Sequence, residues 1–191
     1  MNVTKYNCIF LDIEPLADNC LPFNIPTVGE EFRLELEIKP TDTVVNDASI
    51  IRFTSTTDDT GSLGDEIPSL YFRAGTTKLE VVADVSGNNQ DSTVTPDANN
   101  LALNTWTHVK IESVSNGDGD IIYSVEVGGV RIRTTKNTAA QAFNEVSICF
   151  SDSFHDAADA QVRHVSMTTG ATSATAAVYY INKYGFTIDG N

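Results

Sequence analysis

The clearest pattern in the chain is an alternation of apolar and polar positions with a period of two. In the run FRLELEIKP, which begins at Phe32, every second residue is apolar and most of those between them are charged. This alternation is typical of a β-strand with one buried face and one wet face. Pro40 closes the run, because proline cannot donate a hydrogen bond to a neighbouring strand. The same reading predicts further strands over 49–55, 70–73, 79–85, 106–114, 121–127, 130–133, 146–151 and 162–167.

The segments between these runs contain turn residues and no amphipathic helix. The pair Gly128-Gly129 separates two alternating runs, which predicts a tight hairpin because both glycines adopt a positive φ at little cost. Loops rich in Asp, Asn, Gly, Ser and Thr are expected over 56–64, 86–100, 116–120 and 151–159. Only 152–161 is suited to a helical turn. Many short strands without helices predict an all-β fold, an antiparallel two-sheet β-sandwich of the jelly-roll type.

The two ends of the chain differ in composition from the middle. We expect an N-terminal extension or edge strand over 1–29, a jelly-roll domain over 30–167, and a linker with a C-terminal strand over 168–191. The linker expectation rests on the small, polar run TTGATSATAA. The run VYYINKYGFTI that follows is rich in aromatic and β-branched residues, which favour packing on the sandwich as a strand or strap.

A series of weak motifs resembles a known family. In chain order they are FRLELEIKP, SIIRF, LYFRAGTTKLEVVADVSG, LNTWTHVKI, YSVEVGGVRI, FNEVSICFSD and AQVRHVSM. This order is similar to that of the laminin G-like domains of the concanavalin A-like jelly-roll superfamily, over roughly residues 30–167. The strand with Trp-Thr-His-Val, followed by the Gly-Gly hairpin, is the most specific part.

The resemblance implies an extracellular recognition or adhesion module that binds a glycan or a protein. Many members of the family hold Ca²⁺ at a rim of loops, and the matching positions here are Asp84 in VVADVSG and Asn137 in RTTKNTAA. Oxygens from two loops suit a hard cation such as Ca²⁺. The alternative reading is that both are ordinary turn residues. A further alternative is a structural or assembly subunit whose terminal segments join chains into a homo-oligomer.

The charge balance narrows the class of partner. The net charge is −14, from 26 acidic and 12 basic residues, so the surface repels phosphate backbones and nucleic acid is not an expected partner. No apolar run is long enough to cross a membrane. Arg131, Arg133 and Lys136 form the best candidate ligand-binding patch for a polyanion. A protein or a neutral glycan is the preferred ligand.

The sequence contains three cysteines, which indicate whether the protein works in an oxidising, extracellular compartment. Cys8 and Cys20 flank a short segment that a disulfide would close in an extracellular protein, and Cys149 lies in a strand-like run as a small apolar residue. The pairing remains open from the sequence. The sequon at Asn2 agrees with an extracellular or cell-surface location.

Enzymes on the same fold are the main rival. Glycoside hydrolases of this fold place carboxylates on alternate residues of one strand, and Glu35 with Glu37, or Asp12 with Glu14, have this spacing. The first pair also reads as ordinary wet-face residues. The second lies outside the matching region and lacks a preceding acid, because Phe10 stands there. We therefore expect a binding module and no catalytic residues.

Polysaccharide lyases of this fold use Arg, His and Tyr on the concave sheet. Arg33, His108 and Tyr123 are the available residue types, but the Gln-Ile-His arrangement is missing. His108, His155 and His164 fall on different elements, which disfavours a zinc site with three ligands. Single exposed or half-buried histidines are the expected outcome.

Two local features remain. In GDEIPSLYF, Asp65 and Glu66 join Asp58 and Asp59 as candidates for binding a cation or a basic protein, although a solvated loop is the expected outcome. Trp106 is the only tryptophan. We expect it in the core, with a bulge near His108 that turns its ring inward.

Overall fold

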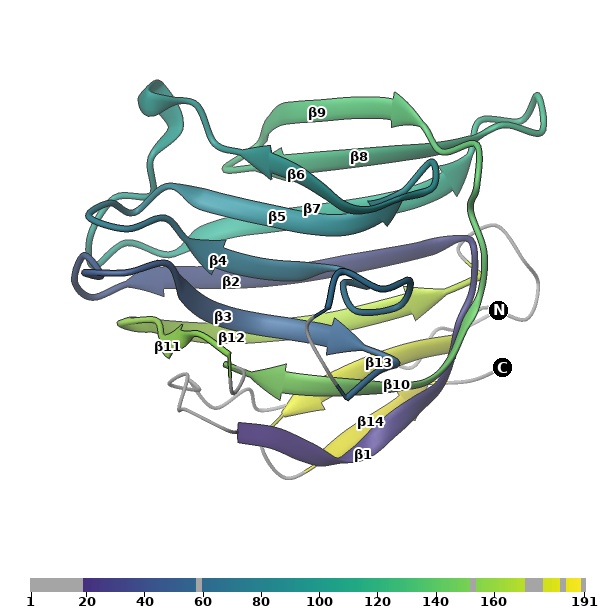
Figure 1. Ribbon diagram of the computed structural model, residues 1–191, viewed down its shortest axis with the longest axis horizontal. Helices are drawn as coiled ribbons and strands as arrows, with labels where there is room; N and C mark the ends of the chain where they lie inside the picture. The colour runs from purple at the N-terminus through teal and green to yellow at the C-terminus, as the bar shows by residue number, and fades with distance from the viewer. Residues whose placement is uncertain (1–18, 58–59, 152–153, 171–176, 183–184, 190–191) are drawn as a thin grey trace, which may run out of the picture.

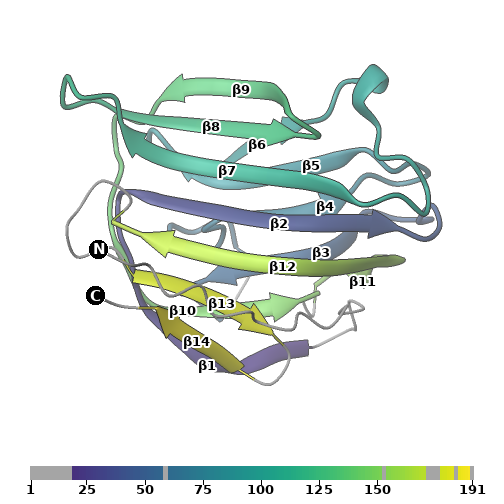
Figure 2. The ribbon, with the colours of Figure 1, turned by 180° about the vertical axis from the view of Figure 1, so that it is seen from behind.

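The protein is a sandwich of two antiparallel sheets, which confirms the predicted fold class. The computed structural model describes residues 19–57, 60–151, 154–170, 177–182 and 185–189. Each sheet has seven strands. We name them the front sheet and the back sheet from their places in Figure 1, and Figure 2 shows the back sheet from its own side. The described residues contain one short 3₁₀ helix, Asp97–Asn99, and no helix long and apolar enough to cross a membrane.

The front sheet runs in the order β1, β10, β3, β4, β5, β6, with β11 parallel to β3. Its strands are β1 (Asn19–Val28), β10 (Phe143–Phe150), β3 (Ala48–Thr54), β4 (Ser69–Phe72), β5 (Leu79–Val85), β6 (Asn88–Val94) and β11 (Asp156–Ala157). The back sheet runs in the order β14, β13, β12, β2, β7, β8, β9. Its strands are β14 (Gly185–Asp189), β13 (Ala177–Asn182), β12 (Ala160–Thr169), β2 (Phe32–Pro40), β7 (Thr107–Ser115), β8 (Ile121–Val127) and β9 (Val130–Lys136).

The core lies between the two sheets and follows the alternation in the sequence. Leu34, Leu36 and Ile38 of β2 are fully buried, and the charged residues between them lie on the outer face. Across the sandwich, Leu70 and Phe72 of β4 are also fully buried. Burial of apolar area at about 25 cal/mol per Å² is the main stabilising contribution to such a core. The period-two pattern therefore fixes which face of each strand points inward.

One hairpin lies where the glycine pair predicted it, and a second hairpin lies where a loop was predicted. Gly128 and Gly129 both have positive φ and join β8 to β9, which confirms the predicted tight turn. The prediction of a loop over 86–100 was wrong for its first half, because β6 (Asn88–Val94) lies there. Its residues are mostly polar because it is an edge strand. The pair Ser86-Gly87, also with positive φ, forms the two-residue turn that precedes it.

The segment suited to a helical turn is extended instead. Residues 156–157 form β11, and Ala160 begins β12, so the described part of this segment, 154–161, holds no helical turn. β11 pairs with the start of β3, and this pairing satisfies backbone groups that a short helix would satisfy internally.

Both ends of the described chain join the sheets (Figure 1). β1 pairs with β10 at the edge of the front sheet, and β13 and β14 extend the back sheet from β12. β1 also contacts β14, so these strands meet at one end of the sandwich. β6 and β9 form the outer edges of the two sheets at the opposite end.

A disulfide joins Cys20 of β1 to Cys149 of β10, across a separation of 129 residues. The suggestion of a bridge between Cys8 and Cys20 was therefore wrong. Antiparallel pairing places Cys20 directly opposite Cys149, and this register decides the partner. Cys8, like Asp12 and Glu14, lies outside the described residues.

The expectation for Trp106 was also wrong, because its side chain is half-buried and lies outside the core. β7 pairs with β2 without a register shift, so Val109 and Ile111 face inward and the even-numbered residues face outward. No bulge near His108 interrupts the alternation. The ring of Trp106 instead packs with two cations, with the guanidinium carbon of Arg163 at 4.0 Å and Nζ of Lys39 at 4.9 Å from its centroid.

Candidate functional site

The outer face of the front sheet carries charged side chains that are removed from solvent. Arg52, Asp65 and Glu66 are only 2%, 0% and 3% exposed. Arg52 Nε donates to the backbone oxygen of Asp65 at 3.1 Å, and the Asp65 carboxylate accepts from the backbone N–H of Ser62 at 2.7 Å. The prediction that Asp65 and Glu66 lie in a solvated loop was therefore wrong. Asp58 and Asp59 lie outside the described residues.

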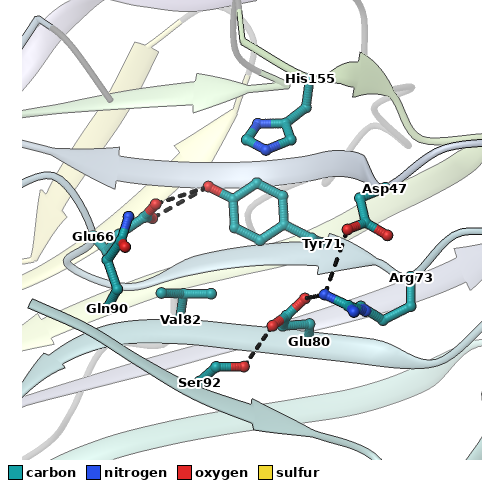
Figure 3. A pocket seen from close by; sticks show the side chains of 9 residues that line it. All are labelled: Asp47, Glu66, Tyr71, Arg73, Glu80, Val82, Gln90, Ser92 and His155. Atoms are coloured by element: carbon teal, nitrogen blue, oxygen red, sulfur yellow. Dashed lines mark hydrogen bonds and ion pairs between the residues drawn. The ribbon is translucent and has the colours of Figure 1, made fainter. Parts of the chain in front are cut away.

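A hollow of about 280 Å³ opens on this face beside the buried charges (Figure 3). This is slightly below the range of about 300–1,000 Å³ that is usual for small-molecule sites. We call it the sheet-face hollow. Its lining residues come from β4, β5, β6 and four adjoining loops: Asp47, Glu66, Tyr71, Arg73, Glu80, Val82, Gln90, Ser92 and His155.

Tyr71 and Glu66 form one side of the hollow. The hydroxyl of Tyr71 donates to the Glu66 carboxylate, with oxygen–oxygen distances of 3.1 and 3.2 Å. Tyr71 is directly opposite Glu80 in the pairing of β4 with β5, so the outward faces of the two strands place both side chains together. The ring of His155 lies beside that of Tyr71, with centroids 4.8 Å apart and planes tilted by 51°.

A connected chain of polar groups forms the opposite side (Figure 3). Arg73 Nη1 lies 2.9 Å from Glu80 Oε2 and 3.4 Å from Asp47 Oδ2, and Ser92 Oγ donates to Glu80 Oε1 at 2.5 Å. The hydrogen bond to Glu80, with the charges of Glu80 and Asp47, raises the pKa of Arg73 above its usual value. Asp47 also accepts from the backbone N–H of Ala74 at 2.7 Å, which fixes its loop against the turn after β4.

His155 reaches the hollow because β11 follows it immediately. Ala157 pairs with Ser49 of β3, and the N–H of Ala158 donates to the Ser49 oxygen at 2.9 Å. Asn46 Nδ2 donates to Asp156 Oδ2 at 3.0 Å, which adds a second attachment. The segment that carries His155 is therefore held on the sheet at a fixed position.

The sheet-face hollow carries more negative than positive charge. Its lining includes the three carboxylates of Asp47, Glu66 and Glu80, and one guanidinium, that of Arg73. An anionic ligand would meet net repulsion there, since like charges in a partly desolvated site interact strongly. A neutral ligand with many hydroxyl groups meets carboxylate acceptors, guanidinium donors and an amide within one small volume.

The two predicted calcium ligands line a different hollow of about 230 Å³ at the end of the sandwich. The Asp84 carboxylate accepts from the backbone N–H of Gly64 at 2.6 Å, and its Oδ1 is buried without a hydrogen-bond partner among the described residues. Burial raises the pKa of Asp84 to about 7, opposed by the Gly64 hydrogen bond and reinforced by the nearby charge of Asp65.

Asn137 holds two loops together. Its Oδ1 accepts from the backbone N–H of Ser86 at 2.8 Å and of Ala139 at 3.2 Å. Asp84 Oδ1 is therefore the one unengaged side-chain oxygen of the predicted pair, whereas Ca²⁺ takes six to eight oxygens. Among the residues that the structure describes, no group of three His, Cys, Asp or Glu side chains is arranged to hold a metal. The side chains present fit Ca²⁺ poorly.

The predicted basic patch does not form a single surface. Arg131 lies 4.0 Å from both Glu112 and Glu126 on the outer face of the back sheet. Arg133 instead pairs with Asp91 of β6 in the front sheet.

The third residue, Lys136, pairs with Asp120 at 2.6 Å. Each of the three cations thus has a carboxylate neighbour, which lowers the local positive charge that a polyanion would need.

The outer face of the back sheet holds the residues of the hydrolase hypothesis. Glu37 Oε2 accepts from Arg163 Nε at 2.7 Å and lies 2.6 Å from His164 Nδ1. Burial raises the pKa of Glu37, but these hydrogen bonds and charges outweigh it and leave the pKa below its usual value. Glu35 lies 4.0 Å from His108 Nε2. Glu37 therefore belongs to a cross-strand ion pair with Arg163, and Glu35 lies beside His108 on the same wet face.

The three residues of the lyase hypothesis are not brought together. Arg33 pairs with Glu112 at 2.7 Å on the outer face of the back sheet, where His108 also lies. Tyr123 is 2% exposed and points into the core. The groups that do meet, Tyr71, His155 and Glu66, were not predicted as a site. Tyr71 lies between the inward-facing Leu70 and Phe72 of the same strand. The period-two alternation therefore predicts that its side chain points to the outer face of the sheet.

No protein-family model matches the chain, and no curated protein matches it by sequence. Solved structures with a similar fold include the heptameric SAP-like pentraxin from Limulus polyphemus, at 13% identity and a TM-score of 0.51, covering 78% of this chain and 67% of that one. An endo-β-1,4-glucuronan lyase from the fungus Trichoderma reesei matches at 11% identity and a TM-score of 0.51, covering 84% and 80%.

The ligand-binding domain of botulinum neurotoxin serotype D, in complex with N-acetylneuraminic acid, matches at 13% identity and a TM-score of 0.49. That match covers 83% of this chain and 36% of the toxin chain. At these identities the likeness concerns the fold. The pentraxin and the lyase show that this chain shares a jelly-roll β-sandwich fold with them.

Proposed function

We propose that this protein is a non-enzymatic recognition module that binds a neutral glycan in the sheet-face hollow, and that it works outside the cell. The observation that supports this most directly is the arrangement of Glu80, Arg73 and Asp47 beside Tyr71. Charged planar groups make strong hydrogen bonds to hydroxyl groups, and their mutual ion pairs hold them in position before a ligand arrives. The laminin G-like assignment is part of this proposal.

The charge of the site supports a neutral sugar over a uronate or a sulfated glycan. Carboxylates outnumber guanidinium groups in the lining, and the whole chain carries −14. The disulfide between Cys20 and Cys149 supports the extracellular part of the proposal, since such bonds persist in oxidising compartments.

The test is binding of neutral oligosaccharides to matched variants. Cello-, xylo- and manno-oligosaccharides are titrated into the wild type by calorimetry, followed by the variant Glu80→Gln. Glu126→Gln is the control, because Glu126 is also a partly exposed ion-paired glutamate but lies on the back sheet. The proposal predicts that only Glu80→Gln weakens binding. Absence of binding by every neutral oligosaccharide contradicts it.

A polysaccharide-cleaving enzyme is the second candidate, and one observation favours it. The Tyr71 hydroxyl, the His155 imidazole and the Glu66 carboxylate are proton donors and acceptors grouped in one hollow. The glucuronan lyase of the same fold makes uronate polymers a useful substrate test. Release of reducing ends by the wild type, abolished in His155→Ala and retained in His108→Ala, would establish catalysis in place of binding.

Rim calcium binding by Asp84 and Asn137 stays a separate prediction from the sequence, although the side chains present fit Ca²⁺ poorly. If Ca²⁺ binds the native state, millimolar Ca²⁺ raises the melting temperature of the wild type. The variant Asp84→Ala then shows no rise. An unchanged melting temperature of the wild type with and without Ca²⁺ contradicts the site.

A further inference from the structure

Three hollows on the outer face of the front sheet share lining residues. The sheet-face hollow and a second hollow of about 440 Å³ are both lined by Asp47 and His155. The second hollow and a third, of about 250 Å³, are both lined by Phe154. The three therefore meet along the segment that contains Phe154 and His155.

Together these hollows cross most of the sheet. The third hollow is lined from β1, β10 and β3, whereas the sheet-face hollow is lined from β4, β5 and β6. In the sheet order, β10, β3, β4, β5 and β6 are five consecutive strands. At about 4.8 Å between neighbouring strands, their span is roughly 19 Å. This length exceeds what one sugar ring occupies.

Phe154 lies where the second and third hollows meet, and its side chain is unusually open for a phenylalanine. It is 47% exposed, although the guanidinium carbon of the buried Arg52 lies 5.2 Å from its ring centroid. A cation over the face of an aromatic ring attracts the ring and favours this orientation. An aromatic ring oriented in this way and open to solvent is suited to stacking on the apolar face of a pyranose.

The third hollow is suited to hydroxyl groups. Its lining includes the side chains of Thr54, Thr56 and Ser147, and Arg52 is its one charged residue. Taken together, the three hollows are lined by four carboxylates (Asp47, Glu66, Glu80 and Asp156) and two guanidinium groups (Arg52 and Arg73), so they carry no excess of positive charge. One class of ligand, a linear neutral polymer, satisfies all three.

We propose that the three hollows form one groove for a linear neutral oligosaccharide of several units, with Phe154 as a stacking platform outside the sheet-face hollow. This inference rests on the proposed glycan-binding function. It adds that affinity rises with the number of sugar units in the oligosaccharide. It also adds that Phe154 contacts sugar units that a disaccharide bound in the sheet-face hollow does not reach.

The test compares disaccharides and hexasaccharides of the cello-, xylo- and manno- series, titrated into the wild type and Phe154→Ala. Loss of one aromatic contact is expected to weaken hexasaccharide binding roughly threefold to tenfold. Disaccharide binding is expected to stay unchanged. Phe154→Tyr, which keeps the ring, is expected to bind like the wild type.

Leu103→Ala is the matched control, because Leu103 is 46% exposed and does not line any of the three hollows. Equal affinity for disaccharide and hexasaccharide, with Phe154→Ala unchanged, overturns the groove and leaves the single-hollow function standing. Failure of both lengths to bind overturns the groove and the proposed function together.

Discussion

The hydroxyl of Tyr71 donates to the carboxylate of Glu66 in a place where both side chains are almost completely removed from water, at 5% and 3% exposure. A buried carboxylate depends on such donors, because the loss of one leaves part of its desolvation cost uncompensated. This pair therefore links the stability of the sheet to the shape of the sheet-face hollow.

Tyr71→Phe is predicted to lower the free energy of unfolding by about 1–3 kcal/mol, because it removes a hydrogen bond to a buried charged group. Tyr123→Phe is the control. Tyr123 is also nearly buried, but its hydroxyl has no hydrogen-bond partner among the described residues, so its removal should be neutral or stabilising. Urea denaturation measures both. Equal destabilisation by the two variants would show that the Tyr71–Glu66 contact has no special role.

The disulfide between Cys20 and Cys149 closes a long loop and attaches the edge strand β1 to β10. Cys149→Ser is predicted to destabilise the protein by about 2–5 kcal/mol, mainly because the unfolded chain gains freedom. Thermal unfolding with and without reductant measures the effect. Cys8→Ser is the matched control and should retain the stability and reductant sensitivity of the wild type. A wild-type melting temperature that reductant does not change would argue against the bridge.

Asp84 is predicted to make stability fall as the pH rises. Its pKa is raised from 3.8 to about 7 in the folded protein, so the native state binds a proton more tightly than the unfolded state. Its contribution is complete below the unfolded pKa and is lost as the pH rises through the folded pKa. Relative to Asp84→Asn, which does not titrate, the wild type should lose stability between about pH 4 and pH 7. A constant difference between the two proteins across this range, measured by denaturation, would rule out a raised pKa.

Trp106 provides a spectroscopic probe of the back sheet, since it is the only tryptophan in the chain. Arg163 packs on its ring and also donates to Glu37, so Arg163→Ala removes both contacts. The emission is predicted to shift to the red as the indole gains water. The stability loss is expected to be about 0.5–1 kcal/mol for the cation–π contact. Lys110→Ala, on the same face but away from the ring, should leave the emission unchanged. An unshifted spectrum in Arg163→Ala would contradict the stacking.

The fold was largely predictable because alternation reports burial directly. Leu34, Leu36 and Ile38 show the inward face of β2 without any knowledge of its neighbours. The same rule, applied strictly from Val109 back to Trp106, would have placed the indole outside the core. Edge strand β6 escaped prediction because it contributes little to the core and its residues are mostly polar.

The candidate site was less predictable because its residues are brought together by tertiary structure. Tyr71 and Glu80 meet through strand pairing, but His155 arrives through β11, which pairs with β3 about 100 residues earlier in the chain. A two-residue strand has no periodicity to detect. The disulfide partner of Cys20 could not be predicted either, because it depends on the register between β1 and β10, which only the tertiary structure gives.

Backbone amide chemical shifts report whether the ligand binds on the outer face of the front sheet. A neutral hexasaccharide that binds in calorimetry is titrated into ¹⁵N-labelled protein. We predict that the largest shifts map to Tyr71, Glu80, Ser92 and His155 around the sheet-face hollow. Shifts confined to the rim around Ser86 and Asn137, or to the back sheet around Trp106, would show that the ligand binds elsewhere.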